Sequence, residues 1–246
     1  MWSTIGGFFL PFQGLTLVFR PGLRRYVLVP LVLNVVIFAG LAYVASHYFD
    51  VFMDRWLPTH EWLAFLRWVL WAIFATAYAL ALFYGFTLIA NLIGAPFNAL
   101  LAARVEEKLT GELPQQADAS VLAAIGPALA GELSKILYLA SRALPLLILF
   151  LVPGLNILVS IGWVLFGFWF LTIEYADYPM GNHGIAPRDQ RKHLRSRRWK
   201  SLLFGAGVTT LMLIPVLQFA AMPAAVAGAT AMWVEQLAER SSQAPG

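Results

Sequence analysis

Four long apolar runs, separated by short charged segments, dominate the pattern of the chain. Bounded by their flanking charges, the runs cover residues 26–49, 68–103, 143–173 and 201–234. A helix needs about 20 apolar residues to cross a hydrocarbon core of about 30 Å. The first run therefore predicts one transmembrane helix. The second predicts another over 68–95, with Gly94-Ala95-Pro96 as the place where it bends or ends.

The third and fourth runs are broken near their middles, by Pro153-Gly154 and by Pro215. Each run is shorter than the roughly 40 residues that two crossings need, so each is either one kinked span or a hairpin that returns to its own side. Two hairpins would leave Arg55 and Arg67 as the only far-side residues among the 17 lysines and arginines. The positive-inside rule favours this arrangement, with both termini cytoplasmic.

Between these runs the polarity changes with helical spacing. From Ser120 onward, apolar residues recur at the period of a helix, and charged residues fall on the opposite face, so residues 118–142 predict an amphipathic helix lying on the bilayer. Residues 174–200 predict a basic cytoplasmic loop, with Glu174 and Asp177 at a solvated helix end. The fold class is thus a single all-α integral membrane domain over 1–246. It has two transmembrane helices and two re-entrant hairpins, at 143–173 and 201–234.

Composition agrees with a membrane protein and leaves little room for catalysis. The chain is 60% hydrophobic and 12% charged, whereas soluble domains average about 45–50% and about 25%. It has no cysteine, and its four histidines are scattered. No zinc-protease, serine-hydrolase or P-loop motif is present. We therefore expect no enzyme activity, metal or cofactor.

The basic stretch from Arg188 to Lys200 has only a superficial likeness to a nucleic-acid patch. A basic stretch beside hydrophobic segments is usually a topology determinant or a contact for anionic lipid. We expect the lipid bilayer as a partner and no nucleic acid.

A possible anion site precedes the first transmembrane helix. Arg24 and Arg25 follow a Pro21-Gly22 turn. They could simply anchor the helix end at the membrane surface. However, the first amides of the helix, around Leu23 to Tyr26, lack intrahelical acceptors, and the helix dipole is positive there. Free N–H groups and two guanidinium groups together predict a site for a tetrahedral oxyanion.

A route for such an anion needs oriented dipoles, because no ionisable residue lies deep in an apolar run. Irregular backbone at a hairpin tip must be buried in protein or line a wet cavity, since unpaired peptide groups in lipid are costly. We therefore take the carboxamides in or beside the runs as candidate pathway residues: Asn34, Asn91, Asn98, Asn156 and Gln218.

Four stretches in order resemble the CysZ family of sulfate permeases: GLRRYVLVPLVLN, NLIGAPFNALLAARVE, EYADYPMGNHGI and IPVLQFAAMPAAVAGATAMW. The resemblance covers essentially the whole chain. It implies two long transmembrane helices, two half-penetrating hairpins and assembly into homo-oligomers. It also implies that sulfate binds at Gly22, Leu23 and Arg24, beside Arg25. The family's Pro-Phe-Asn motif falls on Pro96, Phe97 and Asn98, followed by Arg104 and Glu106.

The same resemblance implies uptake of sulfate across the bacterial inner membrane for cysteine biosynthesis, with a possible link to proton movement. The alternative is a membrane scaffold or assembly factor that transports nothing. Polar, broken helices at mid-bilayer depth argue against a scaffold, because a scaffold does not need them.

Overall fold

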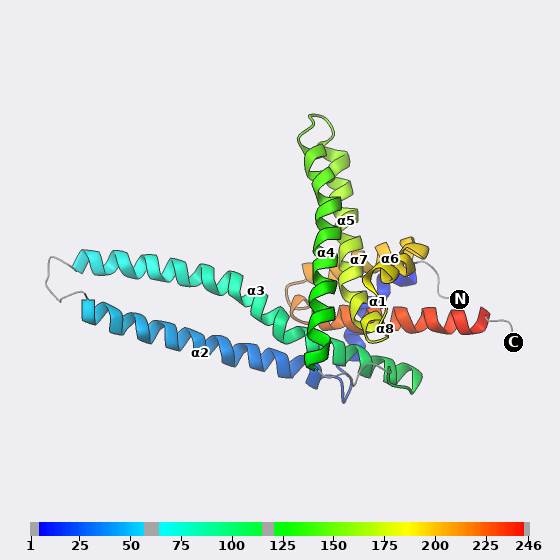
Figure 1. Cartoon of the computed structure of the whole chain (residues 1–246), viewed down its shortest axis with the longest axis horizontal. Helices are drawn as coiled ribbons and strands as arrows, with labels where there is room; N and C mark the ends of the chain where they lie inside the picture. Colours follow the sequence, from blue (N-terminus) through cyan, green and yellow to red (C-terminus); the bar gives the residue numbers. More distant parts are fainter. Residues whose placement is uncertain (1–4, 57–63, 115–120, 244–246) are drawn as a thin grey trace. The chain divides into compact units, whose positions relative to one another are not determined.

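The computed structural model describes residues 5–56, 64–114 and 121–243, which are helical and contain no strand. The helices in these ranges are α1 (Gly6–Val18), α2 (Arg25–Trp56), α3 (Ala64–Thr110), α4 (Val121–Phe150), α5 (Asn156–Gly181), α6 (Pro187–Ser196), α7 (Arg198–Leu213) and α8 (Gln218–Gln243) (Figure 1). The prediction of an all-helical membrane protein is confirmed at this level. The helices form two compact units, residues 28–97 and residues 1–27 with 98–246.

The unit of residues 28–97 consists of α2 from Leu28 onward and α3 up to Phe97, which run antiparallel and side by side (Figure 1). Aromatic rings join the two helices: the Phe49 ring stacks on the Phe74 ring with centroids 3.8 Å apart, and Trp71 meets Phe49 edge-on at 4.7 Å. Both helices outrun the predicted spans. In particular, α3 does not end at Pro96 but continues to Thr110. Proline removes one backbone donor, and the helix-forming residues that follow it keep the helix intact.

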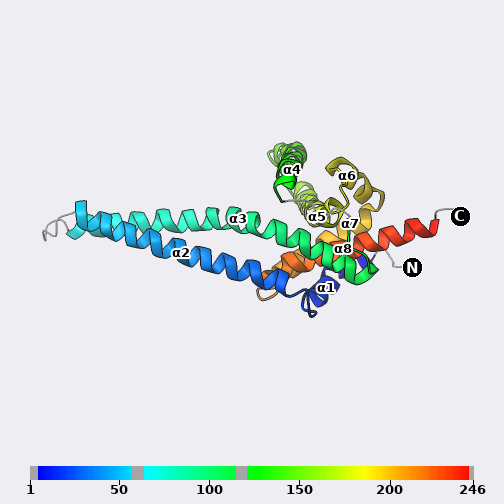
Figure 2. The same cartoon turned by 60° about the horizontal axis from the view of Figure 1, so that its bottom comes forward.

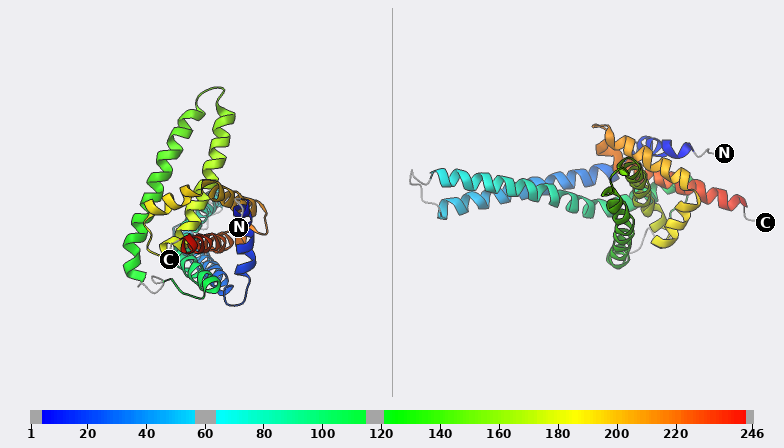
Figure 3. Two further views of the ribbon diagram at one scale, coloured as in Figure 1. Left: turned by 90° about the vertical axis from the view of Figure 1, so that its right-hand side faces the viewer. Right: turned by 90° about the horizontal axis from the view of Figure 1, so that it is seen from above.

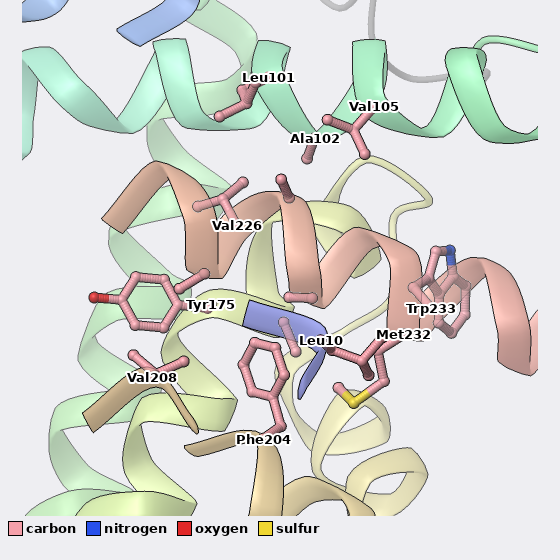
Figure 4. Close-up of a cluster of buried hydrophobic side chains, with 14 of the residues drawn as sticks. Leu10, Leu101, Ala102, Val105, Tyr175, Phe204, Val208, Val226, Met232 and Trp233 are labelled. Carbon is pink, nitrogen blue, oxygen red and sulfur yellow. The ribbon is translucent and has the colours of Figure 1, made fainter. Parts of the chain in front are cut away.

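The second unit is organised by close packing of α1, α5, α7 and α8. α1 lies along both α7 and α8 (Figure 2). Glycines allow the helix backbones to touch: a Cβ on Gly14 would lie 2.0 Å from the Ala224 carbonyl oxygen, and one on Gly205 would lie 1.9 Å from that of Phe168. Small residues at crossings are the usual means by which membrane helices pack closely. Leu10, Phe204, Val208 and Met232 fill the space around these crossings (Figure 4).

The chain reverses direction at both predicted breaks. α4 and α5 are joined at residues 151–155, where Gly154 has φ +88°, and α7 and α8 are joined at residues 214–217. The arms of the α4–α5 hairpin lie together at the tip and diverge from it (Figure 3). Glycine suits this tip because a positive φ is strained for any residue with a Cβ.

α4 differs from the expectation of an amphipathic helix followed by a separate hairpin arm. It is one continuous helix across residue 142 and through Pro145, because a single proline costs one backbone hydrogen bond that the rest of a long helix can offset. Its faces are also inverted relative to a soluble protein: Lys135 is 7% exposed, whereas Leu133 and Ile136 are 57% and 58% exposed. Outward apolar side chains suit a helix that contacts lipid.

The basic segment 174–200 is mostly helix, comprising the end of α5, all of α6 and the start of α7. Glu174 and Asp177 do not lie at a solvated helix end. Both accept hydrogen bonds from Lys135, at 3.3 and 2.9 Å. The sequence placed the lysine and the carboxylates in separate segments, and only the packing of α4 on α5 brings them together.

Within the described residues, three helical segments have the length and apolar character to cross a membrane: Arg25–Phe49, Leu133–Phe150 and Asn156–Gly181. Few of their residues are buried inside the protein. Large outward-facing apolar surface of this kind requires lipid or another protein.

Candidate functional site

The turn between α1 and α2 presents the two arginines to the outside. Gly22 has φ +91°, and the space where its side chain would lie is open. Leu23, by contrast, is 3% exposed and belongs to the hydrophobic core. Arg24 and Arg25 are exposed. Leu23 therefore fixes the turn to the protein while the neighbouring backbone and both guanidinium groups remain accessible.

The amides of this turn divide into two sets. The Leu23 N–H donates to the Arg20 carbonyl oxygen at 3.2 Å, and the Tyr26 N–H donates to that of Leu23 at 3.0 Å. Among the described residues, the N–H groups of Arg24 and Arg25 have no backbone acceptor. The predicted donor set is thus narrowed to two adjacent amides, next to the open glycine and at the positive end of α2.

The last turns of α3 add cations to this site. The Tyr26 hydroxyl accepts a hydrogen bond from Arg25 at 3.0 Å and interacts with Arg104. Arg104 in turn pairs with Glu107 at 2.8 Å. The hydrogen bond with Glu107 is the main cause that raises the pKa of the Arg104 guanidinium, and the bond with Tyr26 adds to it.

Lys108 approaches the same turn and was not among the sequence candidates. Its Nζ donates to the Pro21 carbonyl oxygen at 3.3 Å. Lys108 stands one helical turn after Arg104, a spacing that places both side chains on one face of a helix. That spacing was readable from the sequence. The contact of Lys108 with Pro21, 87 residues away, could not be predicted from the sequence.

The other α3 candidates lie in a buried polar cluster. Asn98 and Glu106 are 6% and 4% exposed. The Glu106 Oε1 lies 2.7 Å from His183 Nε2, and the His183 ring centroid lies 5.5 Å from that of Trp233. Neighbouring Asn182 donates to the Ala99 carbonyl oxygen at 2.9 Å. His183 and Trp233 were missed by the sequence reasoning, because nothing local in the chain connects them to α3.

Several polar atoms of this cluster have no hydrogen-bond partner among the described residues, namely Asn98 Nδ2, Glu106 Oε2 and Trp233 Nε1. Buried polar groups are nearly always paired, so unpaired ones call for water or a ligand. The cluster can therefore bind small polar molecules, and its mixture of hydrogen-bond donors and acceptors suits water.

The remaining candidates are not gathered at one place. Asn34, in the unit of residues 28–97, has a buried Oδ1 without a partner in the described part of that unit. Asn91 belongs to α3, and its side chain lies outside the described residues. Asn156 and Gln218 are exposed at the first positions of α5 and α8, on the tips of different hairpins. In the described part of the chain, no three potential metal ligands come together.

Comparison with known proteins gives this geometry its context. The family model described as "Sulfate transporter CysZ/Etoposide-induced protein 2.4" matches residues 10–223. The chain belongs to this family. The match includes the arginine turn, both helices of the 28–97 unit and the α4–α5 hairpin.

Curated relatives carry a more specific name. The chain is 44% identical to the sulfate transporter CysZ of Pseudomonas fluorescens over 91% of each chain. It is 43% identical to that of Pseudomonas syringae pv. tomato over 91% of this chain and 90% of the relative. For Pseudomonas aeruginosa the identity is 42% over 93% and 94%. The predicted family is thus confirmed, and these relatives are transporters rather than enzymes.

Proposed function

We propose that this protein carries sulfate across the bacterial inner membrane, supplying it for cysteine biosynthesis, and that it first binds the anion at Gly22, Leu23, Arg24 and Arg25. The observation that carries the proposal is the turn itself. In a chain of the sulfate-transporter family, two exposed arginines and two free amides flank an open glycine. No other surface feature described above combines these donors so closely.

The chemistry of the turn matches a tetrahedral dianion. Sulfate accepts hydrogen bonds on all four oxygens, and charge-assisted bonds from guanidinium groups are roughly twice as strong as neutral ones. The two amides at the start of α2 add donors at the positive helix end. Arg104 and Lys108 raise the local positive potential, although Glu107 neutralises part of it.

From the turn, α3 supplies a polar route. Arg104 lies beside the capture turn, and Asn98 and Glu106 of the same helix lie in the buried cluster. We propose that the anion passes along α3, from the side that carries Arg104 to the side that carries Asn98, together with water. Asn34, Asn91, Asn156 and Gln218 remain candidates for other parts of the route. A link to proton movement remains a prediction.

The depth of the α4–α5 hairpin supports the re-entrant arrangement. Tyr138 accepts a hydrogen bond from Trp169 Nε1 at 2.9 Å, and the guanidinium of Arg142 lies over the Tyr138 ring at 5.5 Å. Aromatic residues with arginines are typical of the membrane–water interface. Beyond Tyr138 and Trp169 the arms extend only about 18–20 Å at 1.5 Å per residue. This is less than the hydrocarbon core of about 30 Å.

A complete crossing by this hairpin would bring exposed Arg142 near the middle of the bilayer, facing lipid. We therefore propose that both hairpins enter and return on the cytoplasmic side, where the termini also lie. The charge distribution supports this side, since Arg55 and Arg67 are the only basic residues left opposite it. A protomer whose hairpins cover part of the bilayer would complete its pathway by assembling into a homo-oligomer.

The capture site is tested by Arg24→Ala, assayed for sulfate binding and for sulfate flux in proteoliposomes. Losing one charge-assisted interaction should weaken sulfate affinity about ten- to a hundredfold. Arg195→Ala, an exposed arginine on α6, removes the same charge elsewhere and should change affinity less than twofold. If the two variants changed sulfate affinity equally, or if Arg24→Ala did not change it, the arginine turn would be only a membrane anchor.

The topology is tested by cysteine accessibility, which is direct because the native chain has no cysteine. Leu151→Cys places a thiol at the tip of the α4–α5 hairpin, and Arg55→Cys serves as a far-side reference. A membrane-impermeant maleimide applied from the periplasmic side should label Arg55→Cys and spare Leu151→Cys. Equal labelling of both from that side would mean that the hairpin crosses the membrane.

A further inference from the structure

A cavity of about 470 Å³ lies between α4 and α6. α4 contributes Gly131 and Ser134, and α6 contributes its first residues with Lys192. The two helices lie close together beside α5 (Figure 2). The cavity is separate from the arginine turn and from the buried cluster around Glu106, since it shares no lining residue with either.

The α6 side of the cavity is positively charged. Ala186 and Pro187 begin the helix, so its positive end faces the cavity. Arg188 and Lys192 line the same wall. The one carboxylate among the lining residues, Asp189, is already paired with Lys192 at 2.8 Å. The lining therefore retains a net positive charge, on Arg188, after that pair is formed.

A third cation lies beside the cavity and lacks a full set of partners. The Arg191 guanidinium is held over the Tyr138 ring at 4.9 Å, and its Nη2 donates to Ser134 Oγ at 3.4 Å. Its Nη1 is buried without an acceptor in the described part of the protein. A buried cationic nitrogen without an acceptor is costly, so this site favours an anion. Ser134, which Arg191 contacts, itself lines the cavity.

The surface next to the cavity is apolar and exposed. On α4, Leu133, Ile136 and Leu137 are 57%, 58% and 61% exposed, and they flank Ser134 along the chain. Tyr138 lies one helical turn beyond Ser134, bonded to Trp169 and with Arg142 over its ring, and this group has the character of a membrane interface. A free inorganic anion would use only the charged wall. An anionic phospholipid would use both surfaces, its phosphate on the cations and its acyl chains along α4.

We infer that this cavity binds the phosphate group of an anionic phospholipid, held by Arg188 and the start of α6, with Arg191 adding positive charge beside the cavity. The site attaches the α4–α6 region to the leaflet that α6 faces. It is independent of sulfate transport, because none of its residues belongs to the capture turn. Basic residues near an anionic membrane surface typically contribute about 1 kcal/mol each, and the cavity gives the headgroup a defined binding position.

The test uses the full chain purified in detergent, with lipids added back and bound lipid counted by native mass spectrometry. Phosphatidylglycerol should bind at one molecule per chain, well above phosphatidylcholine. Arg188→Glu should weaken phosphatidylglycerol binding at least about tenfold, by loss of one cation and gain of one anion. Arg195→Glu makes the same charge change on exposed α6 surface outside the cavity and should alter binding less than twofold.

Further arms separate the lipid from a soluble anion and from misfolding. Inorganic phosphate or sulfate, added at constant ionic strength, should not displace the lipid, whereas short-chain phosphatidylglycerol should. The milder Arg188→Gln, with an unchanged thermal transition, should still weaken binding. Equal losses for Arg188→Glu and Arg195→Glu would show diffuse charge attraction in place of a site. Displacement by inorganic phosphate, or equal retention of phosphatidylcholine, would also overturn the inference.

Discussion

The two helical hairpins, α4–α5 and α7–α8, have similar sequence patterns, but the first exposes its apolar side chains and the second buries them. In each, a long apolar run is broken by proline, and the chain turns back there. α4 and α5 leave most of their large aliphatic side chains exposed on their outer faces. α7 and α8 instead pack against α1, with Phe204, Val208 and Met232 buried. Apolar length alone therefore does not decide whether a membrane hairpin faces lipid or protein.

The size of the side chains explains the difference. Gly205 and Gly207 in α7, and Gly228 in α8, place backbone against backbone in neighbouring helices. α8 also has a run of fully buried alanines. The outer faces of α4 and α5 carry leucine, isoleucine and valine instead. Lipid solvates large aliphatic groups as well as a protein interior does, so only small residues gain from close helix contact.

The hairpins are alike at their bases, where each is held by a buried lysine. Lys200 of α7 pairs with Glu235 of α8, and Lys135 of α4 pairs with Glu174 and Asp177 of α5. Both lysines are 7% exposed, but Glu235 is 17% exposed and the other two carboxylates are 30% exposed. The lysine–carboxylate pair of the α7–α8 hairpin is therefore less exposed to solvent than that of the α4–α5 hairpin.

The packing difference predicts the largest effect for Gly205→Ala. Its Cβ would lie 1.9 Å from the Phe168 carbonyl oxygen, a clash with backbone that cannot be relieved locally. We expect a loss of at least about 3 kcal/mol, the upper part of the range for overpacked cores. Gly167→Ala, on α5, meets no atom within 4 Å and should be neutral or stabilising. Thermal unfolding in detergent micelles measures both variants. Equal destabilisation would contradict the inference that helix packing is tighter at Gly205 than at Gly167.

The lysine pairs predict a smaller, graded effect. Lys200→Met leaves Glu235 buried and unpaired, which should cost about 3 kcal/mol. Lys135→Met leaves carboxylates that water still reaches, so the cost should be nearer 1 kcal/mol. Glu235→Gln in the Lys200→Met background should recover part of the loss, because it removes the stranded charge. If Lys135→Met proved the more destabilising of the two single variants in the same thermal assay, burial of the unpaired carboxylate would not be what sets the cost.

The tips predict the smallest effect. Gly154→Ala should cost about 1 kcal/mol, because its φ of +88° is unfavourable for a residue with a Cβ and no neighbouring atom interferes. In the α7–α8 hairpin no residue of the tip has a positive φ, so Pro215→Ala should change stability by less than about 0.5 kcal/mol. A neutral Gly154→Ala would show that this tip adapts its backbone freely.

The sequence was a good guide wherever neighbouring residues carry the information. It placed helices over the apolar runs and reversals at Pro153-Gly154 and Pro215, and it selected an arginine turn that is in fact exposed. It was less reliable at boundaries, since α3 continues past residue 95 to Thr110 and α4 continues through residue 142. A local breaker or charge lowers helix stability by an amount that the rest of a long helix can offset.

By itself, then, the sequence determined a helical membrane protein with a basic turn before its first long helix, because hydropathy and turn chemistry act over a few residues. Tertiary structure alone decided which hairpin is buried and that the polar face of α4 turns inward to Glu174 and Asp177. It also decided that Lys108 reaches Pro21 and that Glu106 meets His183. Those pairs are 87 and 77 residues apart, and their contact depends on how whole helices pack. No periodicity within one segment records that packing.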